Sequence, residues 1–458
     1  MNQPAIQLSQ TLLQQLVVLL ERDIDDAARA RARLHLLDWL GCVAYGSRSE
    51  VADKLRQYLS IWGSSGSSWS MGEPDRSWQD ALLLNAALGN VAEMDDLHRT
   101  SILHPGPVVV PAAVTVAELV GATPVALLDA IVIGYEAMIR IGRALGPDHY
   151  ALYHNTSTCG GFGAAAATAH LLGLDRNAFV SALANAGSRT GGLWQLRHEA
   201  VDTKQLHNAG AAHSGVLAAL LAQADVRGPA SLLEGSQGFF AATSPMAQPL
   251  AVVDNAGDSW QIFQCSFKPW PACRHAHAAI DAVRALGDLD PSAVESVRIR
   301  TYRDALLFCD KPEPRNAAEA RFSLQHCAAV SLLFGRPEIR HFEGEYLHRT
   351  DVVAMRGKIF VAIDEQMDRA YPSHFGAFAA VLDKAGHERE IRVRDAWGDP
   401  EQPMSETDIN AKARALMCVA DLHERDIDAV MDFTTGLTQA GAQLAPWLRS
   451  LRALGAGK

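Results

Sequence analysis

The sequence predicts a mainly α-helical protein with a smaller α+β domain, and three observations support this fold class. Apolar residues recur at helical spacing through the first two thirds of the chain. Strand-like alternation becomes evident only after residue 260, and a helical pattern returns at Ser405. We therefore expect a large helical domain formed by residues 1–265 and completed by 405–458, with a smaller α+β domain over residues 270–400.

The helices of the large domain are predicted from the spacing of their apolar residues. Leucines recur at helical intervals from Leu12 to Leu20 and, after an acidic break, from Leu34 to Leu40. Alanine-rich segments further on favour helix and allow helices to pack closely, and Gly146-Pro147 should end one of them. These later helices are expected at 112–120, 127–145, 164–172 and 211–224.

The elements of the smaller domain have a different pattern. Residues 297–302 alternate apolar and polar side chains, as a half-buried strand does, and 359–363 is rich in strand-forming residues. Two further strands, 379–382 and 391–393, flank a turn at Lys384–His387. One helix is expected at 317–334. Ser405 and Asp408 resemble a capping box that starts the last helices.

Composition excludes several classes of protein. The 458 residues carry 41 basic and 52 acidic side chains, a net charge of −11. This balance argues against binding to nucleic acid or to an anionic membrane surface. It still allows a local cluster of cations to hold a small anionic substrate.

Cysteine usage and hydropathy indicate a reduced, cytoplasmic setting. The seven cysteines are scattered, odd in number and without a CxxC pair, so a zinc ribbon is not expected. Residues 1–10 are polar and lack the features of a secretory signal. Glu118 and Asp129 interrupt the most apolar stretch, 107–134, so no membrane span is expected.

The first segment that could carry chemistry runs from Glu93 to His98 and continues to His104-Pro105-Gly106. The adjacent carboxylates Asp95 and Asp96 raise each other's pKa, and His98 or His104 could share their protons. The alternative is the end of a helix followed by a polar loop.

The second segment, 154–163, combines His154 with threonines and glycines before an alanine-rich helix. A helix start can bind an anion, but the spacing is not that of a dinucleotide loop. A Ser/Thr cap with glycines for packing explains the glycines better, and His154 remains the candidate. In the third segment, 202–210, Lys204 could pair with a carboxylate or act as a base, or be a solvated charge.

The fourth segment, 267–277, holds four potential cations, Lys268, Arg274, His275 and His277, in a stretch stiffened by prolines and a tryptophan. Such a cluster suits a carboxylate or phosphate. The alternative is a stiff surface loop with solvated cations. A zinc site at the two histidines lacks a third ligand. Cys273 is either a nucleophile or, with no evident partner, a buried thiol.

These segments resemble the MmgE/PrpD family over nearly the whole chain and in the family's order. The matching blocks include "NAALGNVAEMDDLHRTSILHPGPVVVPAAV", "HNTSTCGGFGAAAATAHLLGLD", "TKQLHNAGAAHSGVLAALLA", "FKPWPACRHAHAAIDA" and "EARFSLQHCAAVSLLFG". The resemblance implies a helical domain with a lid-like α+β domain. It also implies a homodimer that needs no organic cofactor and no metal.

The resemblance also assigns roles to particular residues. It implies that Asp95, Asp96, His104, His154 and Lys204 are catalytic. It implies that Lys268 binds substrate, and we add His98, Cys273, Arg274, His275 and His277 as further substrate-binding candidates. The chain departs from the decarboxylase-like members at three positions, where it has Glu93 for Asp, Leu97 for Thr and Cys273 for His.

The family's chemistry implies proton transfer at a carbon next to a carboxylate of a small di- or tricarboxylic acid. The first hypothesis is a 2-methylcitrate-dehydratase-like hydro-lyase. The alternatives are an epimerase of the iminodisuccinate type, a cis-aconitate-type decarboxylase, and a non-catalytic homologue that binds a carboxylate. The same residues would serve dehydration, epimerisation and decarboxylation, so the sequence does not choose between these reactions.

Overall fold

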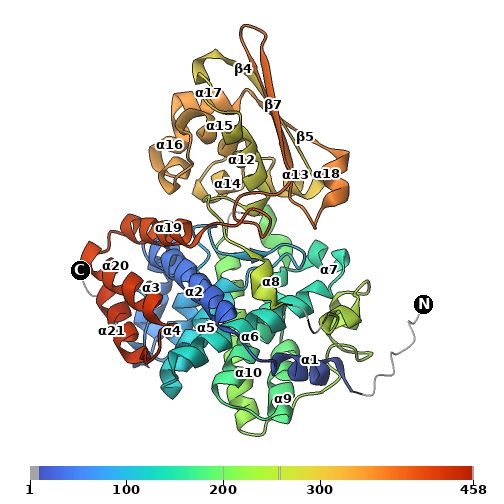
Figure 1. Ribbon diagram of the computed structural model, residues 1–458, viewed down its shortest axis with the longest axis vertical. Helices are drawn as coiled ribbons and strands as arrows, with labels where there is room; N and C mark the ends of the chain where they lie inside the picture. The colour runs from blue at the N-terminus through green and yellow to red at the C-terminus, as the bar shows by residue number, and fades with distance from the viewer. Residues whose placement is uncertain (1–9, 200, 256, 258, 456–458) are drawn as a thin grey trace. The chain divides into compact units, whose positions relative to one another are not determined.

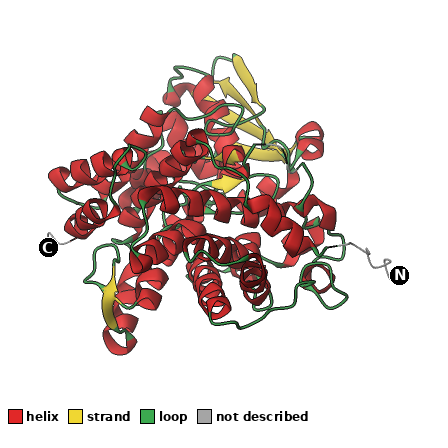
Figure 2. Cartoon of the chain, turned by 60° about the horizontal axis from the view of Figure 1, so that its bottom comes forward, coloured by secondary structure: helices red, strands yellow, loops and turns green. Residues whose placement is uncertain are grey.

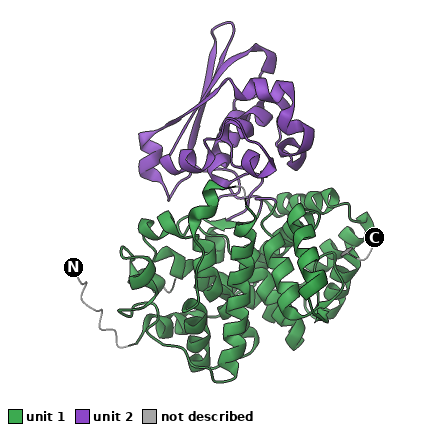
Figure 3. Cartoon of the chain, turned by 180° about the vertical axis from the view of Figure 1, so that it is seen from behind, with its two compact units in different colours: residues 1–91, 95–265, 405–458 green, residues 92–94, 266–404 purple. Residues whose placement is uncertain are grey.

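The computed structural model describes residues 10–199, 201–255, 257 and 259–455. Residues 1–9, which bear on the expected absence of a secretory signal, lie outside this description. The chain forms two compact units (Figure 3). Unit 1 comprises residues 1–91, 95–265 and 405–458, and unit 2 comprises 92–94 and 266–404.

Unit 1 is a helical assembly (Figure 1). Its first helices are α1 (Leu12–Leu20), α2 (Asp26–Gly46), α3 (Glu50–Trp62), α4 (Trp78–Leu88), α5 (Gly106–Val120), α6 (Pro124–Arg143), α7 (Pro147–Leu152), α8 (Asn155–Leu171), α9 (Arg176–Gly187), α10 (Thr203–Gln223) and α11 (Phe239–Thr243). Helices α19 (Glu406–Val419), α20 (Glu424–Gly436) and α21 (Leu444–Gly455) complete it. Short strands β1 (Ser65–Ser68) and β2 (Leu97–His98) were not predicted.

Helix α8 lies at the centre of unit 1 and packs against α5, α6, α9 and α10. Its glycines and alanines are buried, so the neighbouring backbones approach closely. A Cβ atom added at Gly215 of α10 would lie 2.5 Å from the Cβ of Ala164. The alanine-rich sequence therefore allows close helix contact, as expected. The polar residues at the start of α8 take no part in this packing of small side chains.

The C-terminal helices are fixed to the N-terminal ones by a buried ion pair. Lys412 of α19 lies 2.6 Å from Asp38 of α2, and both side chains are almost fully buried. The predicted capping box is present, because the Ser405 hydroxyl accepts from the Asp408 amide and the Asp408 carboxylate accepts from the Ser405 amide.

Unit 2 contains a four-stranded mixed sheet in the order β5-β4-β6-β7. Its strands are β4 (Val294–Thr301), β5 (Ile359–Ile363), β6 (Ala377–Asp383) and β7 (Glu388–Val393). Strand β4 is parallel to β5, with Ile299 opposite Val361, and antiparallel to β6. Strands β6 and β7 form the predicted hairpin around residues 384–387. A mainly helical unit joined to an α+β unit confirms the predicted fold class.

The helices of unit 2 lie beside this sheet (Figure 2). Helices α12 (His277–Ala285) and α15 (Leu324–Phe334) pack against each other and against the strands. The expected single helix over 317–334 is wrong, because the chain breaks at residues 322–323 and Ser323 caps a new helix by accepting from the His326 amide. The helices are α12 (His277–Ala285), α13 (Arg303–Cys309), α14 (Ala317–Arg321), α15 (Leu324–Phe334), α16 (Gly344–His348), α17 (Thr350–Arg356) and α18 (Glu365–Ala370).

None of the helices within the described residues combines the length and the apolar composition needed to cross a bilayer.

Candidate active site

The first element of the site is a carboxylate–histidine pair in the loop between α4 and α5. His104 Nδ1 lies 2.9 Å from Asp95 Oδ2 and 2.8 Å from the backbone oxygen of Asp96. A carbonyl oxygen can only accept, so the proton of His104 stands on Nδ1. Asn90 holds the other side of Asp95, with Nδ2 2.7 Å from Oδ1. Nε2 of His104 is therefore the ring nitrogen that could exchange a proton with a bound molecule.

Asp96 has a different task from its neighbour. Its carboxylate is buried and accepts hydrogen bonds from His35 Nδ1 (2.5 Å), Tyr135 Oη (2.6 Å) and the Gly106 amide (2.8 Å). Burial alone would raise the pKa of Asp96, but these donors hold that pKa below its usual value. A side chain with its oxygens taken in this way is a structural anchor for the 95–106 loop, which favours positioning over the predicted catalytic role.

The loop is also tied to the start of α8. The His104 amide donates to Thr156 Oγ1 at 3.0 Å, and Asn155 Nδ2 donates to the backbone oxygen of Ser101 at 2.9 Å. The Ser/Thr cap that the sequence suggested is not formed, and Thr156 and Asn155 instead connect the histidine loop to the helix. The N-cap position belongs to His154, whose ring makes no capping hydrogen bond.

His154 is buried among other site residues. Its ring lies 4.5 Å from the ring of Trp194, and its Nδ1 lies 3.2 Å from Nδ1 of His207 on α10. Burial lowers the pKa of His154 well below its usual value, and the positive charges of Lys204, His207 and His104 add to this effect while Asp95 opposes it. His154 is therefore neutral at pH 7.

These contacts bring four of the five residues predicted to be catalytic into one neighbourhood of unit 1. Asp95 touches His104, and both act electrostatically on His154 together with Lys204. Lys204 lies in the first turn of α10, one helical turn before His207. The arrangement offers an acid–base imidazole, a neutral imidazole and an ammonium group.

A cavity of about 590 Å³ adjoins this neighbourhood in unit 1. His207 lines it, together with Ser157, Gly192 and Gly210, whereas His154 is not among its lining residues. Gly192 has a φ of 124°, and a Cβ atom there would lie 2.5 Å from Ser157 Oγ. Gly192 thus lines the cavity at a position that requires glycine, and its backbone oxygen accepts from the His154 amide at 2.9 Å.

Sequence reasoning missed His207, His35 and Tyr135. A signal for His207 was present, because Lys204 and His207 are three residues apart and share a helix face. No local pattern could have found His35 and Tyr135, since they reach Asp96 from α2 and α6 across 61 and 39 residues of sequence.

His98 has a local structural role. Its Nδ1 accepts from the Ser101 hydroxyl at 2.7 Å, and the side chain is buried. Burial lowers the pKa of His98 to about 3, with Arg143 and Arg99 adding to the effect. The geometry favours a turn-stabilising histidine over the predicted substrate ligand.

In unit 2, Lys268 is fully buried and paired with Glu93. Its Nζ lies 3.1 Å from the backbone oxygen and 3.5 Å from Oε2 of Glu93. Glu93 has a φ of 53°, the left-handed region that non-glycine residues rarely adopt. The backbone is therefore held in a strained form at the point where this carboxylate meets the ammonium group.

The other predicted cations of unit 2 are buried and engaged with partners, which excludes the alternative of a surface loop with solvated cations. Arg274 forms an ion pair with Asp399 and is 3% exposed. His277 Nε2 donates to the backbone oxygen of Ala272 at 3.0 Å. His275 Nδ1 lies 2.7 Å from the Tyr302 hydroxyl, and its ring stacks on Phe375 and Phe308.

Cys273 lies buried in the same stretch. Its thiol is hydrogen-bonded to the thiol of Cys309. Burial alone would raise the pKa of Cys273, but this hydrogen bond and the positive charge of Lys268 lower the pKa below its usual value. Each cysteine within the described residues is a free thiol.

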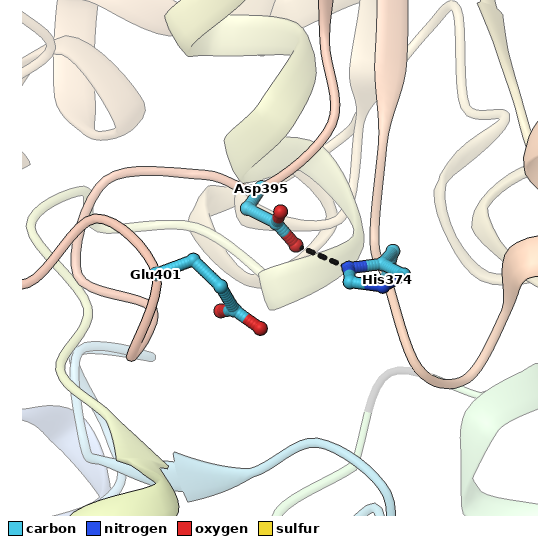
Figure 4. Close-up of side chains that lie close together, drawn as sticks. All are labelled: His374, Asp395 and Glu401. Carbon is cyan, nitrogen blue, oxygen red and sulfur yellow. Dashed lines mark hydrogen bonds and ion pairs between the residues drawn. The ribbon is translucent and has the colours of Figure 1, made fainter.

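Figure 4 shows a group in unit 2 with the donor set of a metal site, His374, Asp395 and Glu401, whose ligand atoms lie within 4.8 Å of one another. His374 Nδ1 lies 2.6 Å from Asp395 Oδ1, and Arg394 Nη2 lies 2.7 Å from His374 Nε2. Both ring nitrogens are engaged and a guanidinium stands beside them. A cation would have to displace these contacts, so we describe the group as an ion-paired cluster.

The fold and the site together define a two-unit, mainly helical protein with a buried carboxylate–histidine pair. Comparison with known families names the class. The MmgE/PrpD N-terminal domain matches residues 16–251, and the MmgE/PrpD C-terminal domain matches residues 270–433. The chain belongs to the MmgE/PrpD family, which confirms the resemblance seen in the sequence.

Individual relatives are similar over different lengths. The chain is 28% identical to human cis-aconitate decarboxylase over 421 residues, which cover 86% of this chain and 84% of the relative. The mouse cis-aconitate decarboxylase is 27% identical over 416 residues, 86% of this chain and 83% of the relative. The 2-methylcitrate dehydratase of Salmonella typhimurium is 30% identical over 232 residues, 47% of this chain and 45% of the relative.

Proposed function

We propose that this protein is a cofactor-independent lyase that decarboxylates a small tricarboxylate of the cis-aconitate type. The sequence analysis placed a 2-methylcitrate-dehydratase-like hydro-lyase first. The comparisons favour the alternative, because the likeness to cis-aconitate decarboxylases covers 86% of this chain and the likeness to the dehydratase covers 47%.

The pairing of His104 with Asp95 is the observation that supports the proposal most. The proton on Nδ1 is fixed by the Asp96 backbone oxygen, and the Asp95 carboxylate can stabilise positive charge on the ring. Nε2 is then able to give a proton to, or take one from, a carbon next to a carboxylate.

The proposed step balances with these groups. Lys204 holds a substrate carboxylate, and the bond between the departing carboxylate and its carbon breaks. Carbon dioxide leaves, and the electron pair stays on carbon, delocalised towards a neighbouring carboxylate. His104 delivers one proton from Nε2 to that carbon and regains one from solvent. Neutral His154 stabilises the developing negative charge.

Dehydration is the second candidate, and a specific observation favours it. Glu93, Leu97 and Cys273 are the three positions at which the sequence resemblance implies other residues in decarboxylase-like members. In dehydration His104 would remove the proton, and a second group would protonate the departing hydroxyl.

Roles for the unit 2 residues belong to the same proposal. We assign Lys268 as the candidate cation of unit 2, positioned by its ion pair with Glu93. It is the one predicted cation of the 267–277 segment whose partner has a strained backbone. Arg274, His275 and His277 support the fold of unit 2. The expected homodimer and cytoplasmic setting stay predictions.

The test is to incubate the purified protein with cis-aconitate and, separately, with 2-methylcitrate. Release of carbon dioxide from cis-aconitate would support the proposal. An increase in ultraviolet absorbance with 2-methylcitrate, from the alkene that dehydration forms, would favour dehydration instead. Exchange of the hydrogen next to a carboxylate in D₂O without net product would indicate an epimerase. Tight binding without turnover, unchanged in His104→Ala and His154→Ala, would indicate a binding protein.

A further inference from the structure

Two imidazoles in unit 1 face each other through the same kind of nitrogen. Nδ1 of His154 and Nδ1 of His207 are 3.2 Å apart, and their rings are 5.4 Å apart at 36°. A hydrogen bond of this kind needs one donor and one acceptor. The ring that donates therefore decides where the other ring carries its hydrogen.

We propose that His207 is a positioning residue that donates to His154 and so keeps the hydrogen of His154 on Nε2. This inference rests on the proposed function, in which His154 stabilises negative charge on the reacting acid. A neutral imidazole with its hydrogen on Nε2 can donate a hydrogen bond to that charge. With the hydrogen on Nδ1 it could only accept.

The surroundings of the two rings support this direction. His207 is half-buried and lines the cavity of about 590 Å³, whereas His154 is 2% exposed. Burial lowers the pKa of both rings but that of His154 further, so a proton added to the pair resides on His207. The Nδ1 of a protonated His207 can only donate.

The other charged groups near the pair can be weighed in the same way. Asp95 raises the pKa of His154 and so favours a positive charge on its ring, and a bound anionic substrate would act in the same direction. Lys204 and His104 oppose positive charge on His154. A substrate carboxylate bound by Lys204 would offset its effect. These charges act on the pKa of His154, whereas its tautomer follows from which ring donates between the two Nδ1 atoms.

The structure suggests a matched pair of substitutions as the test. In His207→Asn the amide can place a donor close to the position of the present Nδ1, whereas in His207→Asp the carboxylate can only accept. The two side chains are nearly equal in size, so the variants differ in charge and hydrogen bonding rather than in bulk. His213→Gln on the same helix is the control, because His213 stacks on Trp78 away from the pair.

We expect His207→Asn to keep kcat within about 10-fold of the parent and His207→Asp to lose about 10²–10³-fold, the effect of losing one preorganised donor. KM should change little in either variant. Equal losses in both variants, or no loss in His207→Asp, would overturn the inference.

A second measurement needs no turnover. In protein labelled with ¹⁵N-histidine, the His154 signals, assigned from their absence in His154→Gln, should show hydrogen on Nε2 in the parent and on Nδ1 in His207→Asp. Hydrogen on Nδ1 in the parent would overturn the inference even if the lyase is active. A parent with the expected tautomer but no turnover of any tricarboxylate would count against the proposed function alone.

Discussion

His104 forms a pair with Asp95, and Nδ1 of His104 contacts two oxygens at once. Nδ1 of His104 lies 2.9 Å from an Asp95 carboxylate oxygen and 2.8 Å from the backbone oxygen of Asp96. The backbone contact alone fixes which nitrogen carries the hydrogen. The carboxylate is thereby left with an electrostatic task, the stabilisation of positive charge on the ring during proton transfer.

This division of labour predicts a moderate effect for Asp95→Asn. The hydrogen stays on Nδ1, so kcat should fall by about 10- to 100-fold, less than the roughly 10⁴-fold loss that follows when the tautomer is also wrong. Steady-state kinetics with the active tricarboxylate would measure it. Loss of all activity in a folded variant would contradict the assignment of the tautomer to the backbone.

Asp96 should matter for folding more than for chemistry. Tyr135→Phe removes one donor to Asp96 and should lower the free energy of unfolding by about 1–3 kcal/mol, because a buried acceptor loses a partner. Urea unfolding measures the change, and kcat per folded molecule should stay within a few-fold. A large fall in kcat at unchanged stability would make Asp96 a catalytic group after all.

The Lys268–Glu93 pair predicts a double-mutant result. Lys268→Met leaves the Glu93 carboxylate buried without its ammonium partner and should cost about 3–5 kcal/mol of unfolding free energy. Adding Glu93→Gln should recover part of that loss, because the unpaired charge is then gone. Two losses that simply add would show that the residues are not coupled.

Buried neutral histidines predict that stability falls in acid. Burial lowers the pKa of His149 to about 4, and in the unfolded chain it is about 6.5. Between these values only the unfolded state gains the proton, so stability is lost as pH falls through this window. His149→Gln should reduce the slope by about 1.4 kcal/mol per pH unit near pH 5.

Urea unfolding at several values between pH 5 and 7 would measure this slope. The glutamine amide can keep the contacts of His149 with the Thr243 oxygen and the Thr158 hydroxyl. An unchanged slope would mean that His149 titrates alike in both states.

Gly192 offers a matched comparison with its neighbour. Gly192→Ala forces a side chain into a φ of 124° and against Ser157, so it should cost about 1–3 kcal/mol and disturb the backbone hydrogen bond with His154. Gly191→Ala is the control, since a Cβ atom there meets open space. Thermal unfolding and kcat of both variants measure the difference. Equal stability would show that the loop adapts freely.

The sequence predicted best what local pattern determines. Apolar periodicity indicated several helices of unit 1 but missed α3, α4, α7, α9 and α11, and the capping box at Ser405 located the start of α19. The break at Ser323 was missed because a helix continuing through residues 322–323 has the same apolar spacing as two shorter ones. The short strands β1 and β2 carry too few residues for alternation to show.

For the site, pattern located residues but not their roles. Asp95 and Asp96 are adjacent and alike in sequence, yet one meets His104 and the other meets His35 and Tyr135. Likewise the cationic 267–277 segment suggested a cluster that binds a carboxylate or phosphate, whereas Arg274 and His275 have partners inside unit 2. Those partners are distant in sequence, so only the folded chain distinguishes the roles.

The central claim is that His104 transfers a proton at a carbon next to a carboxylate. Its most direct test is turnover of cis-aconitate in D₂O, followed by NMR of the product, for the parent and for His104→Gln. We predict that the parent places one deuterium on a single carbon with one stereochemistry, and that His104→Gln loses at least about 10²-fold in this rate. Deuterated product with the same stereochemistry, formed by His104→Gln at the parental rate, would contradict the account.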